Sequence, residues 1–594
     1  MKIEENKDIT AFTTFGIPVK ARWYAEYESE AELLKLSRTE QFLNNEVLHL
    51  GGGSNLLFIN DFDGLVLNSL ITGISKYEKN PDTVYVIAGA GMMWVDLVNW
   101  CVDNNLAGVE NMAGIPGKVG ASAVQNVGAY GAEAKDVIFS VECFDTLTRS
   151  TRRFSNEECR FGYRDSFFKH EGKERYVVLR VSFLLQKSEY ASNLSYGPLK
   201  DFAASLKSRP TLRQVADEVC HIRDSKLPDP KIIGSAGSFF KNPVISIWHY
   251  KELCSELNID LPAHAVGDHY MKLSAAWLID QSGMKGARVG GAEVWAKQPL
   301  VLVNQENATA KDVAQLAEKV KSAVRKKFRV NLQPEVNYID TSMEIIVLGS
   351  GTSKGVPEIG CECRVCKSTD SHDKRLRASV LVRTHGMNIL IDPSPDFREQ
   401  ALKHNIFDLD AVLITHSHYD HVGGIDDLRP FCASRNLPMY VRKDVDADLR
   451  RRLDYCFIEH PYPGVPTFDM RIIDNYPFYI NGLKIEPVEV MHGKKPIYGY
   501  RIGKFGYITD AKTIAETEVD KLFGLDVLIV NALRDRDHFA HFTIPEALQL
   551  IQEVKPKCAY LTHFCHEAGL HDEIEKNTPA NVHPAYDGLT INIS

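Results

Sequence analysis

The segment GIPGKVGASAVQNVGAYGAE, residues 114–133, decides the fold of the first half of the chain. A second glycine-rich stretch, GGGSN at residues 51–55, follows the apolar run VLHL. Glycine lets a backbone approach a ligand closely and present its N–H groups to a diphosphate, although many glycine-rich turns are purely structural. Neither stretch has the strand–GxGxxG–helix spacing of the dinucleotide fingerprint. If these loops bind a cofactor, they do so in another kind of fold.

Length and composition indicate a globular protein with at least two folding units. The chain has 594 residues, whereas single cores stop growing near roughly 250–300 residues. The net charge of −9 disfavours a protein that mainly grips nucleic-acid phosphates. The N-terminus has no apolar signal region, and no apolar run is long enough to span a bilayer. We therefore expect a cytoplasmic protein without a membrane partner.

Strands and helices are predicted in both halves. β-Branched residues predict strands from Val84 and from Tyr176, and apolar residues on one helical face predict a core-facing helix over residues 309–328. A new strand, MEIIVLGSG, begins at Met343, which resembles the former start of a separate protein. The strands NILID, AVLIT, FGYITD, DVLIVN and CAYLTH follow. Polar residues stand at their carboxyl ends, where α/β proteins usually place their chemistry.

Four residues of metal-ligand type follow the strand AVLIT, namely His416, His418, Asp420 and His421. The first two point to one side of the strand end, and the other two turn toward a second point. Imidazole and carboxylate ligands at two adjacent points suit a pair of zinc, manganese or iron ions. Two metals about 3.5–4 Å apart can activate a water and hold both oxygens of a phosphoryl displacement. The motif therefore predicts a metal-dependent hydrolase.

Three of the twelve cysteines crowd together, at Cys361, Cys363 and Cys366. In a reducing compartment such a cluster indicates a metal site before a disulfide framework. With His566 they form a Cys₃His set, which is typical of one closed structural zinc site. The glycine-rich GSGTSKG before them leads to Pro357 and not to a helix, so we do not expect a nucleotide-binding loop there.

Seven ordered segments of the first half resemble the UDP-N-acetylenolpyruvoylglucosamine reductase family. They are TTFGIP, GGGSNLLF, GIPGKVGASAVQNVGAYGAE, ECRFGYRDSFFK, KLPDPKIIGSAGSFFKNP, AAWLIDQ-GMKGARVGGAEV and LQPEVNYI. The resemblance implies an α+β FAD-binding reductase fold, with a PCMH-type FAD-binding region of two α+β lobes at residues 1–210 and a substrate domain at residues 211–342. It also implies that NADPH reduces FAD, which reduces the ether UDP-N-acetylglucosamine enolpyruvate to UDP-N-acetylmuramate for peptidoglycan precursors. The implied cofactor-binding residues are Gly51, Gly52, Gly53, Ser54, Asn55, Gly114, Ile115, Pro116, Gly117, Gly120, Ala121, Asn126, Gly128, Ala129 and Tyr130.

The same resemblance assigns roles in catalysis. Arg164 matches the residue that stabilises negative charge on the substrate carboxylate, and Glu335 matches its partner. Ser238 matches the general acid that protonates C2, a task for which a serine must be activated by hydrogen bonds. The matching substrate contacts are Tyr196, Lys226 and Asn242, and Lys226 is also a candidate NADPH contact. Without the resemblance, Arg164 fits equally an ion pair with Asp165, Ser238 fits a helix N-cap, and a flavin oxidase is an alternative.

The HxHxDH motif of the second half resembles the metallo-β-lactamase superfamily. This implies an αβ/βα sandwich over residues 343–594, with the remaining metal ligands at later strand ends: His492, a bridging Asp510, and His563. GSGTSKGVPEIGCECRVC and these histidines resemble the phosphoribosyl cyclic phosphodiesterase branch, in which His541 would protonate the leaving group. A small phosphodiester is therefore the expected substrate. The alternatives are a tRNA-processing nuclease, a thioesterase or lactonase, and a non-catalytic module that the metals stabilise.

Overall fold

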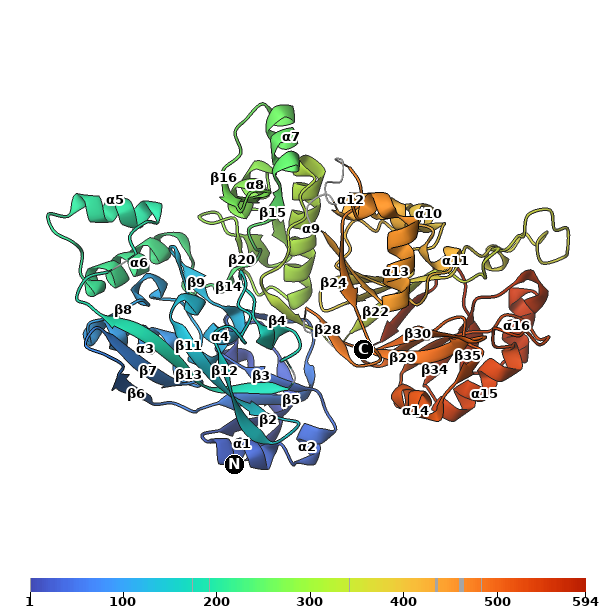
Figure 1. The fold of residues 1–594 in the computed structure, drawn as a ribbon, viewed down its shortest axis with the longest axis horizontal. Helices are drawn as coiled ribbons and strands as arrows, with labels where there is room; N and C mark the ends of the chain where they lie inside the picture. Colours follow the sequence, from blue (N-terminus) through green and yellow to red (C-terminus); the bar gives the residue numbers. More distant parts are fainter. Residues whose placement is uncertain are drawn as a thin grey trace. The chain divides into compact units, whose positions relative to one another are not determined.

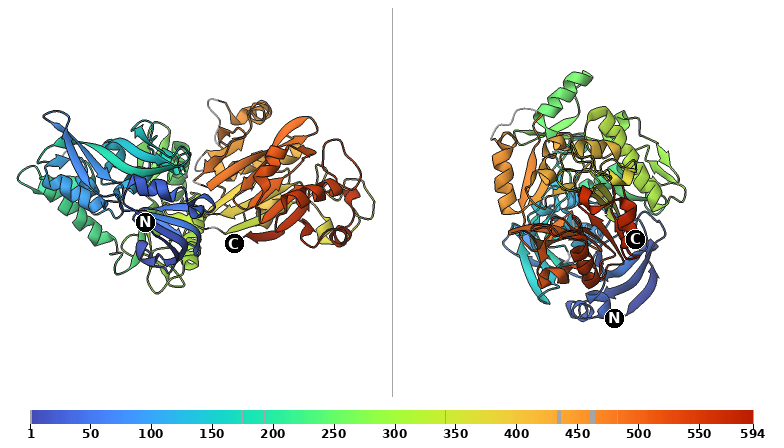
Figure 2. Two further views of the ribbon diagram at one scale, coloured as in Figure 1. Left: turned by 90° about the horizontal axis from the view of Figure 1, so that it is seen from below. Right: turned by 90° about the vertical axis from the view of Figure 1, so that its right-hand side faces the viewer.

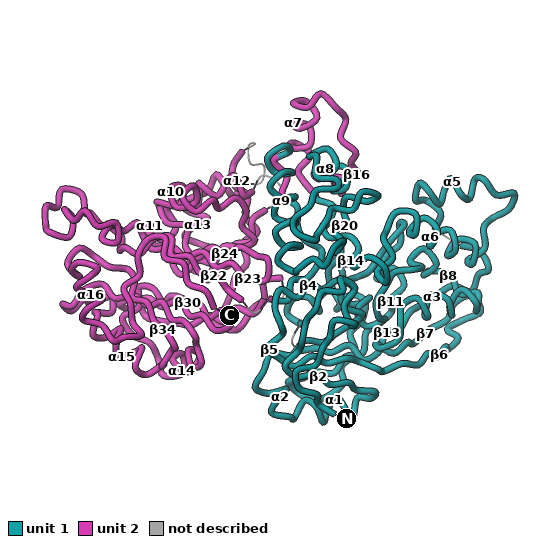
Figure 3. Tube along the Cα trace, turned by 180° about the vertical axis from the view of Figure 1, so that it is seen from behind, with its two compact units in different colours: residues 1–243, 274–328, 332–339 teal, residues 244–273, 329–331, 340–594 magenta. Residues whose placement is uncertain are grey.

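The structure is a computed structural model that describes residues 2–173, 175–191, 193–340, 342–432, 436–458, 464–481 and 483–593. Its contacts divide the chain into two compact units, which Figure 3 colours separately. Unit 1 comprises Met1–Pro243, Ser274–Phe328 and Leu332–Ile339, and unit 2 comprises Val244–Leu273, Arg329–Asn331 and Asp340–Ser594. The three domain boundaries given above remain predictions.

Unit 1 begins with two separate sheets (Figure 1). The first has the order β1-β2-β5-β3 and consists of Ile3–Asp8, Lys20–Tyr27, Phe62–Ser69 and Val47–Leu50. The second has the order β12-β11-β13-β7-β6 and consists of Ser150–Ser155, Ile138–Asp145, Tyr176–Lys187, Thr83–Gly89 and Ile74–Glu78, with β8 (Leu106–Ala107) beside β13. The strands predicted from Val84 and Tyr176 are β7 and β13. The α+β fold expected for the flavin-binding part is confirmed.

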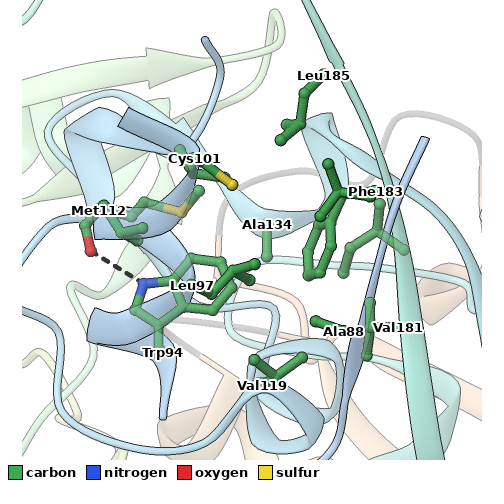
Figure 4. Close-up of a cluster of buried hydrophobic side chains, with 14 of the residues drawn as sticks. Ala88, Trp94, Leu97, Cys101, Met112, Val119, Ala134, Val181, Phe183 and Leu185 are labelled. Carbon is green, nitrogen blue, oxygen red and sulfur yellow. Dashed lines mark hydrogen bonds between the residues drawn. The ribbon is translucent and has the colours of Figure 1, made fainter. Parts of the chain in front are cut away.

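Helices α3 (Trp94–Asp103), α4 (Val119–Gln125) and α6 (Leu212–Lys226) share one apolar core with the second sheet. Figure 4 shows the centre of this core, where the ring of Trp94 lies among apolar side chains that include Leu97, Met112 and Phe183. The indole nitrogen of Trp94 donates a hydrogen bond to the carbonyl of Met112 at 3.0 Å, so its polar atom is satisfied inside the core. Because α4 lies within residues 114–133, this packing fixes the glycine-rich segment against the sheet.

A further sheet of unit 1 has the order β14-β20-β19-β18, made of Gly234–Ser238, Val301–Asn304, Ala292–Val294 and Arg288–Val289. Helix α9 (Ala310–Phe328) lies beside it. The predicted apolar stripe of α9 is buried, which confirms the helix over residues 309–328 within one residue. A parallel pair, β4 (Leu56–Phe58) with β21 (Asn337–Ile339), then joins the end of unit 1 to the chain just after residues 51–55.

Unit 2 contains two large sheets. One has the order β27-β26-β25-β24-β23-β22-β36, made of Phe468–Ile472, Leu437–Val441, Ala411–Leu413, Met387–Ile391, Ser379–Thr384, Met343–Gly349 and Thr590–Ile593. The other has the order β28-β29-β30-β31-β33-β34-β35, made of Phe478–Ile480, Leu483–His492, Lys495–Ile502, Phe505–Ile508, Val527–Asn531, Cys558–Thr562 and Val582–Pro584. β32 (Thr513–Ile514) pairs with β29. The five strands predicted after Met343 are β24, β25, β31, β33 and β34.

The sheets of unit 2 form the middle of four layers; Figure 2 gives two further views of the chain. One apolar cluster takes residues from both sheets, including Ile345 and Phe505, and so lies between them. A second cluster joins the outer face of the first sheet to α10 (Phe397–Lys403) and α13 (Lys443–Arg452), and a third joins the second sheet to α15 (Ile544–Val554). The expected αβ/βα sandwich is confirmed.

Two further features of unit 2 are a small separate sheet and the pairing of the first and last strands of the sandwich. Residues 244–273, which belong to unit 2, form a small sheet with the order β15-β17-β16, made of Val244–Ser246, Tyr270–Leu273 and Ala263–Val266, and the helix α7 (Ile247–Leu257). In the sandwich, Met343 of β22 pairs with Ile593 of β36, so the first and last strands are neighbours.

Of the helices that the structure describes, none is long and apolar enough to cross a membrane.

Candidate active sites

The two glycine-rich loops of unit 1 lie against each other. A Cβ on Gly52 would stand 2.4 Å from the Cα of Gly117, so only glycine permits this approach. The hydroxyl of Ser54 donates to the carbonyl of Pro116 at 3.3 Å. These contacts bring together residues that are more than 60 positions apart, and the backbone of both loops therefore borders one region. This close, side-chain-free approach fits the diphosphate of FAD.

Arg164 lies between the second glycine-rich loop and Glu335. Its Nη2 donates to the carbonyl of Gly128 at 2.5 Å, and its Nε lies 2.9 Å from Oε1 of Glu335. The two side chains of this ion pair are 22% and 15% exposed, so solvent screens them little. The neighbouring Asp165 instead contacts His170 at 2.8 Å, which removes the alternative of an Arg164–Asp165 pair. Arg164 and Glu335 are thus brought together as expected.

Ser238 is the last residue of strand β14 and does not precede a helix, so the N-cap alternative is wrong. The next residue, Phe239, accepts a hydrogen bond from the N–H of Glu335 at 2.7 Å. The amide of Asn55 donates to the carbonyl of Glu335 at 3.0 Å. The strand end that carries Ser238, the first glycine-rich loop and Glu335 therefore meet at one place.

The three expected substrate contacts lie on different elements of unit 1. Tyr196 precedes α5 (Gly197–Ser205), and its ring is 5.3 Å from that of Tyr130 in the glycine-rich loop. Lys226 ends α6, and its carbonyl accepts from the indole nitrogen of Trp295 at 3.0 Å. The side-chain carbonyl of Asn242 accepts from the N–H of Ala275 at 2.9 Å.

Two basic residues of this region were not singled out in the sequence. Lys169 donates to the carbonyl of Arg164 at 3.3 Å, and burial, together with nearby Lys241, lowers the pKa of Lys169 to about 8. Arg223, on α6, lies beside the glycine-rich loop, because a Cβ on Gly114 would be 3.4 Å from its Nε. Burial lowers the pKa of Arg223. Arg164, Lys169 and Arg223 therefore place three cationic side chains in this region.

In unit 2, the predicted metal ligands converge where the parallel strands of both sheets end. His416, His418 and His492 offer nitrogens within 4.8 Å of one another, and the ligand atoms of Asp420, His421 and His563 form a second such group. Asp510, after β31, lies between the groups: its Oδ2 is 3.7 Å from Nε2 of His416 and 2.6 Å from Nε2 of His421, and its Oδ1 is 3.1 Å from Nε2 of His563.

The chemistry of this cluster fits two divalent metal ions. The Nε2 atoms of His416, His421 and His563 and the Oδ2 of Asp510 are buried, and none has a hydrogen-bond partner among the described residues. Such orphaned polar atoms are costly in a protein interior unless something else binds them. Two sets of imidazole and carboxylate donors that share Asp510 are what a bridged pair of metals requires.

Asp392 supports this cluster and was missed in the sequence. It follows β24 and is fully buried, and its Oδ2 lies 2.7 Å from Nδ1 of His421 and accepts from the hydroxyl of Thr415 at 2.7 Å. Burial raises the pKa of Asp392. A carboxylate behind a ligating histidine fixes the ring and its tautomer. The sequence could have indicated this role, because Asp392 stands at the carboxyl end of the predicted strand NILID, as the first metal ligands stand at the end of AVLIT.

His541 lies inside the cluster. Its Nδ1 is 2.9 Å from Oδ1 of Asp510, and its ring is 4.7 Å from that of His492. The turn that carries His541 is held by Thr543, which caps α15 in a reciprocal pair with Glu546. His538 is partly buried, and its ring lies 4.9 Å from that of His541.

The Cys₃His set is also assembled. Nδ1 of His566 lies 3.1, 3.7 and 3.5 Å from the sulfurs of Cys361, Cys363 and Cys366. The N–H of Cys366 contacts the sulfur of Cys363 and lowers the pKa of Cys363 to about 7, which favours the thiolate that binds a metal. Four soft and imidazole donors around one point fit zinc.

Unit 1 thus carries the site of a flavin-dependent reductase, and unit 2 that of a metallo-β-lactamase-fold hydrolase with a place for two metals. Family models match both the reductase part and the hydrolase part of the chain. Residues 21–148 match the FAD binding domain, residues 229–339 match the C-terminal domain of UDP-N-acetylenolpyruvoylglucosamine reductase, and residues 387–564 match the beta-lactamase superfamily domain.

Curated relatives identify the first unit. UDP-N-acetylenolpyruvoylglucosamine reductase of Neisseria gonorrhoeae is 46% identical over 345 residues, which are 58% of this chain and 99% of the relative. The enzyme of Photobacterium profundum is 43% identical over 344 residues, 58% of this chain and 98% of the relative. The chain belongs to the UDP-N-acetylenolpyruvoylglucosamine reductase family and carries the hydrolase domain in addition.

Two solved structures are similar to separate parts of the chain. A diphosphatase from the PhnP family is 38% identical and covers 43% of this chain and 98% of its own, with a TM-score of 0.41. The UDP-N-acetylenolpyruvylglucosamine reductase from Thermus caldophilus is 24% identical and covers 57% of this chain and 99% of its own, with a TM-score of 0.41.

Proposed function

We propose that the chain is a bifunctional enzyme that reduces UDP-N-acetylenolpyruvoylglucosamine in unit 1 and hydrolyses a phosphodiester in unit 2. The first activity follows from the family to which the chain belongs. Among the residues of this chain, the observation that supports the reductase activity is the Arg164–Glu335 ion pair. It lies between a glycine-rich loop and the strand end that carries Ser238.

In the reductase site, FAD would supply the hydride for the enolpyruvyl double bond when bound, and NADPH would be the reductant that restores it. Arg164 stabilises the negative charge that develops on the substrate carboxylate, and removing such a donor typically costs ~10²–10³ in rate. Glu335 and the carbonyl of Gly128 hold the guanidinium plane in place. Ser238 donates a proton from its hydroxyl to C2. The nucleotide sugar is bound by Tyr196, Lys226 and Asn242.

In the hydrolase site, two divalent metal ions, zinc or manganese, supply the Lewis acidity that activates water and the phosphoryl group. Asp510, whose carboxylate lies between the two groups of donors, would be shared by both ions, and the other residues that would hold them are His416, His418, Asp420, His421, His492 and His563. His541 donates a proton to the leaving oxygen, and its position inside the cluster supports this role. The Cys₃His set would hold a third, structural zinc ion.

The reductase proposal is tested with the purified full-length chain. We expect a flavin absorption spectrum, and NADPH oxidation that depends on the enolpyruvyl substrate. A flavin oxidase would instead consume NADPH and oxygen without that substrate, and this result would contradict the proposal.

The hydrolase proposal is tested by metal analysis together with hydrolysis of bis-p-nitrophenyl phosphate. We expect three metal ions per chain, and turnover that falls sharply in His541→Ala while the metal content is unchanged. Bound metals without turnover of any phosphodiester would favour the non-catalytic module.

A further inference from the structure

A lysine of unit 2 lies beside the dinuclear cluster in a position that none of the proposed roles uses. Strands β29 and β30 are joined by a tight hairpin whose first turn residue, Gly493, has a φ of +59°. This turn places Lys495 directly opposite His492 in the ladder. Side chains of directly opposite residues stand on the same face of a sheet, with Cβ atoms about 4.5–5.5 Å apart. Lys495 therefore projects on the side of a metal-cluster histidine.

The end of this side chain reaches the motif that carries the first ligands. The Nζ of Lys495 donates to the hydroxyl of Ser417 at 3.3 Å, and Ser417 stands in the sequence between His416 and His418. Ser417 is only 3% exposed. The ammonium group thus borders the cluster on the side of the His416–His418–His492 group.

Other cations near the cluster are neutralised by carboxylates. Lys512, two residues after Asp510, contacts Asp537 and Glu546 at 2.8 Å. Arg534 and Arg536, on the loop that leads to His541, both pair with Glu567. These three cations are therefore not available to a ligand at full charge.

Lys495 differs from them. Within the described parts of the chain, no carboxylate oxygen lies within 4.0 Å of its Nζ. Asp448 also contacts Ser417, but its carboxylate is already bound by Arg451 at 2.6 Å and by Arg452. An ammonium that is half-buried without a counter-charge is costly, and it is useful where a ligand brings a negative charge.

We propose that Lys495 is a substrate-contacting residue of the hydrolase site, whose ammonium binds a phosphoryl oxygen of the substrate. This inference rests on the proposed phosphodiesterase function. A fixed cation beside the metals would favour an anionic phosphodiester over the uncharged thioesters and lactones that the same metal site could otherwise attack.

The experiment compares Lys495→Ala, Lys495→Arg and Lys484→Ala in the full-length, metal-loaded chain. Lys484 is an exposed lysine at the far end of the same strand β29, so its removal changes the net charge equally without touching the cluster. Two quantities are measured: the affinity for inorganic phosphate by calorimetry, and kcat/KM for bis-p-nitrophenyl phosphate. Metal content and reductase activity of the same samples report whether the chain is intact.

We expect Lys495→Ala to weaken phosphate binding about tenfold or more, as for loss of a charge-assisted hydrogen bond, and to lower kcat/KM roughly 10²-fold. Lys495→Arg should recover part of both quantities, and Lys484→Ala should match the unaltered chain. Phosphate affinity and kcat/KM that are unchanged in Lys495→Ala would overturn the inference and leave the phosphodiesterase function intact. Phosphate binding that depends on Lys495 in a chain without turnover would support the anion contact and refute the phosphodiesterase.

Discussion

Replacing Arg164 by lysine separates the charge of this residue from its geometry. In the structure the guanidinium makes three contacts: Nε to Glu335 at 2.9 Å, Nη2 to the carbonyl of Gly128 at 2.5 Å, and Nη1 to the carbonyl of Asn126 at 3.4 Å. A lysine keeps the positive charge but has a single ammonium on a flexible stem, so it can replace only part of this arrangement.

The size of the effect follows from these contacts. Loss of two hydrogen bonds at about 1 kcal/mol each should destabilise the flavin-binding region locally by about 2 kcal/mol. The substrate carboxylate would also lose a fixed donor, which typically slows the chemical step by ~10²–10³. The flavin is reduced by NADPH in one half-reaction and reoxidised by the enolpyruvyl substrate in the other. Because Arg164 is assigned to the enolpyruvyl substrate and not to NADPH, only the second half-reaction should slow.

Stopped-flow spectroscopy of the flavin measures the half-reactions separately. In Arg164→Lys we expect reduction by NADPH at the unaltered rate and reoxidation by the enolpyruvyl substrate ~10²–10³ slower. Flavin fluorescence during heating reports the local loss of stability. Arg160→Lys is the matched control, because Arg160 pairs with Glu171 at the surface, where the side chains are 55% and 58% exposed. Equal slowing of both half-reactions, or unchanged reoxidation, would refute the assignment.

Four further changes test other groups. Ser238→Ala should leave flavin reduction intact and abolish most product formation, and product formed at the unaltered rate would exclude Ser238 as the acid. Cys363→Ser should remove one zinc per chain and lower the melting temperature of unit 2, and an unchanged zinc content would argue against the site. Asp392→Asn should weaken metal binding 10–100-fold in competition with a chelator, whereas equal affinity would leave Asp392 without its supporting role. Because burial lowers the pKa of Lys169 to about 8, its positive charge is lost as pH rises through 8. KM for the enolpyruvyl substrate should therefore rise above that pH, and Lys169→Gln should remove this rise. The free energy of unfolding should increase with pH between 8 and the ordinary lysine pKa, because the unfolded chain binds more protons than the folded chain in that range.

The elements predicted correctly are those whose sequence signals depend on near neighbours. The apolar period of residues 309–328 and the β-branched runs after Met343 depend only on near neighbours, and the structure has α9, β24, β25, β31, β33 and β34 at those places. The metal ligands were foreseen because a motif of six residues holds four of them. The convergence of His492, Asp510 and His563 on that motif agrees with the resemblance, and their individual roles remain predictions.

Residues whose importance depends on long-range pairing were missed. Lys169 donates to the carbonyl of Arg164, only five positions away, but its burial and its proximity to Lys241 arise only in the folded chain. Lys495 is positioned beside the metal cluster by the register of the β29–β30 hairpin and by its contact with Ser417, which lies 78 positions earlier in the sequence. No local pattern reports such surroundings, because they form only when distant segments within each unit pack together.

The pairing of β22 with β36 has a consequence for how the hydrolase fold can be handled. Since Met343 and Ile593 are partners in one ladder, the two ends of the sandwich leave it side by side. Circular permutation should therefore be tolerated: a short bridge between these strands, with new termini cut in an exposed loop, would break no strand of either sheet. The same adjacency offers a site at which another domain can be appended or exchanged without reorganising the metal-bearing edge.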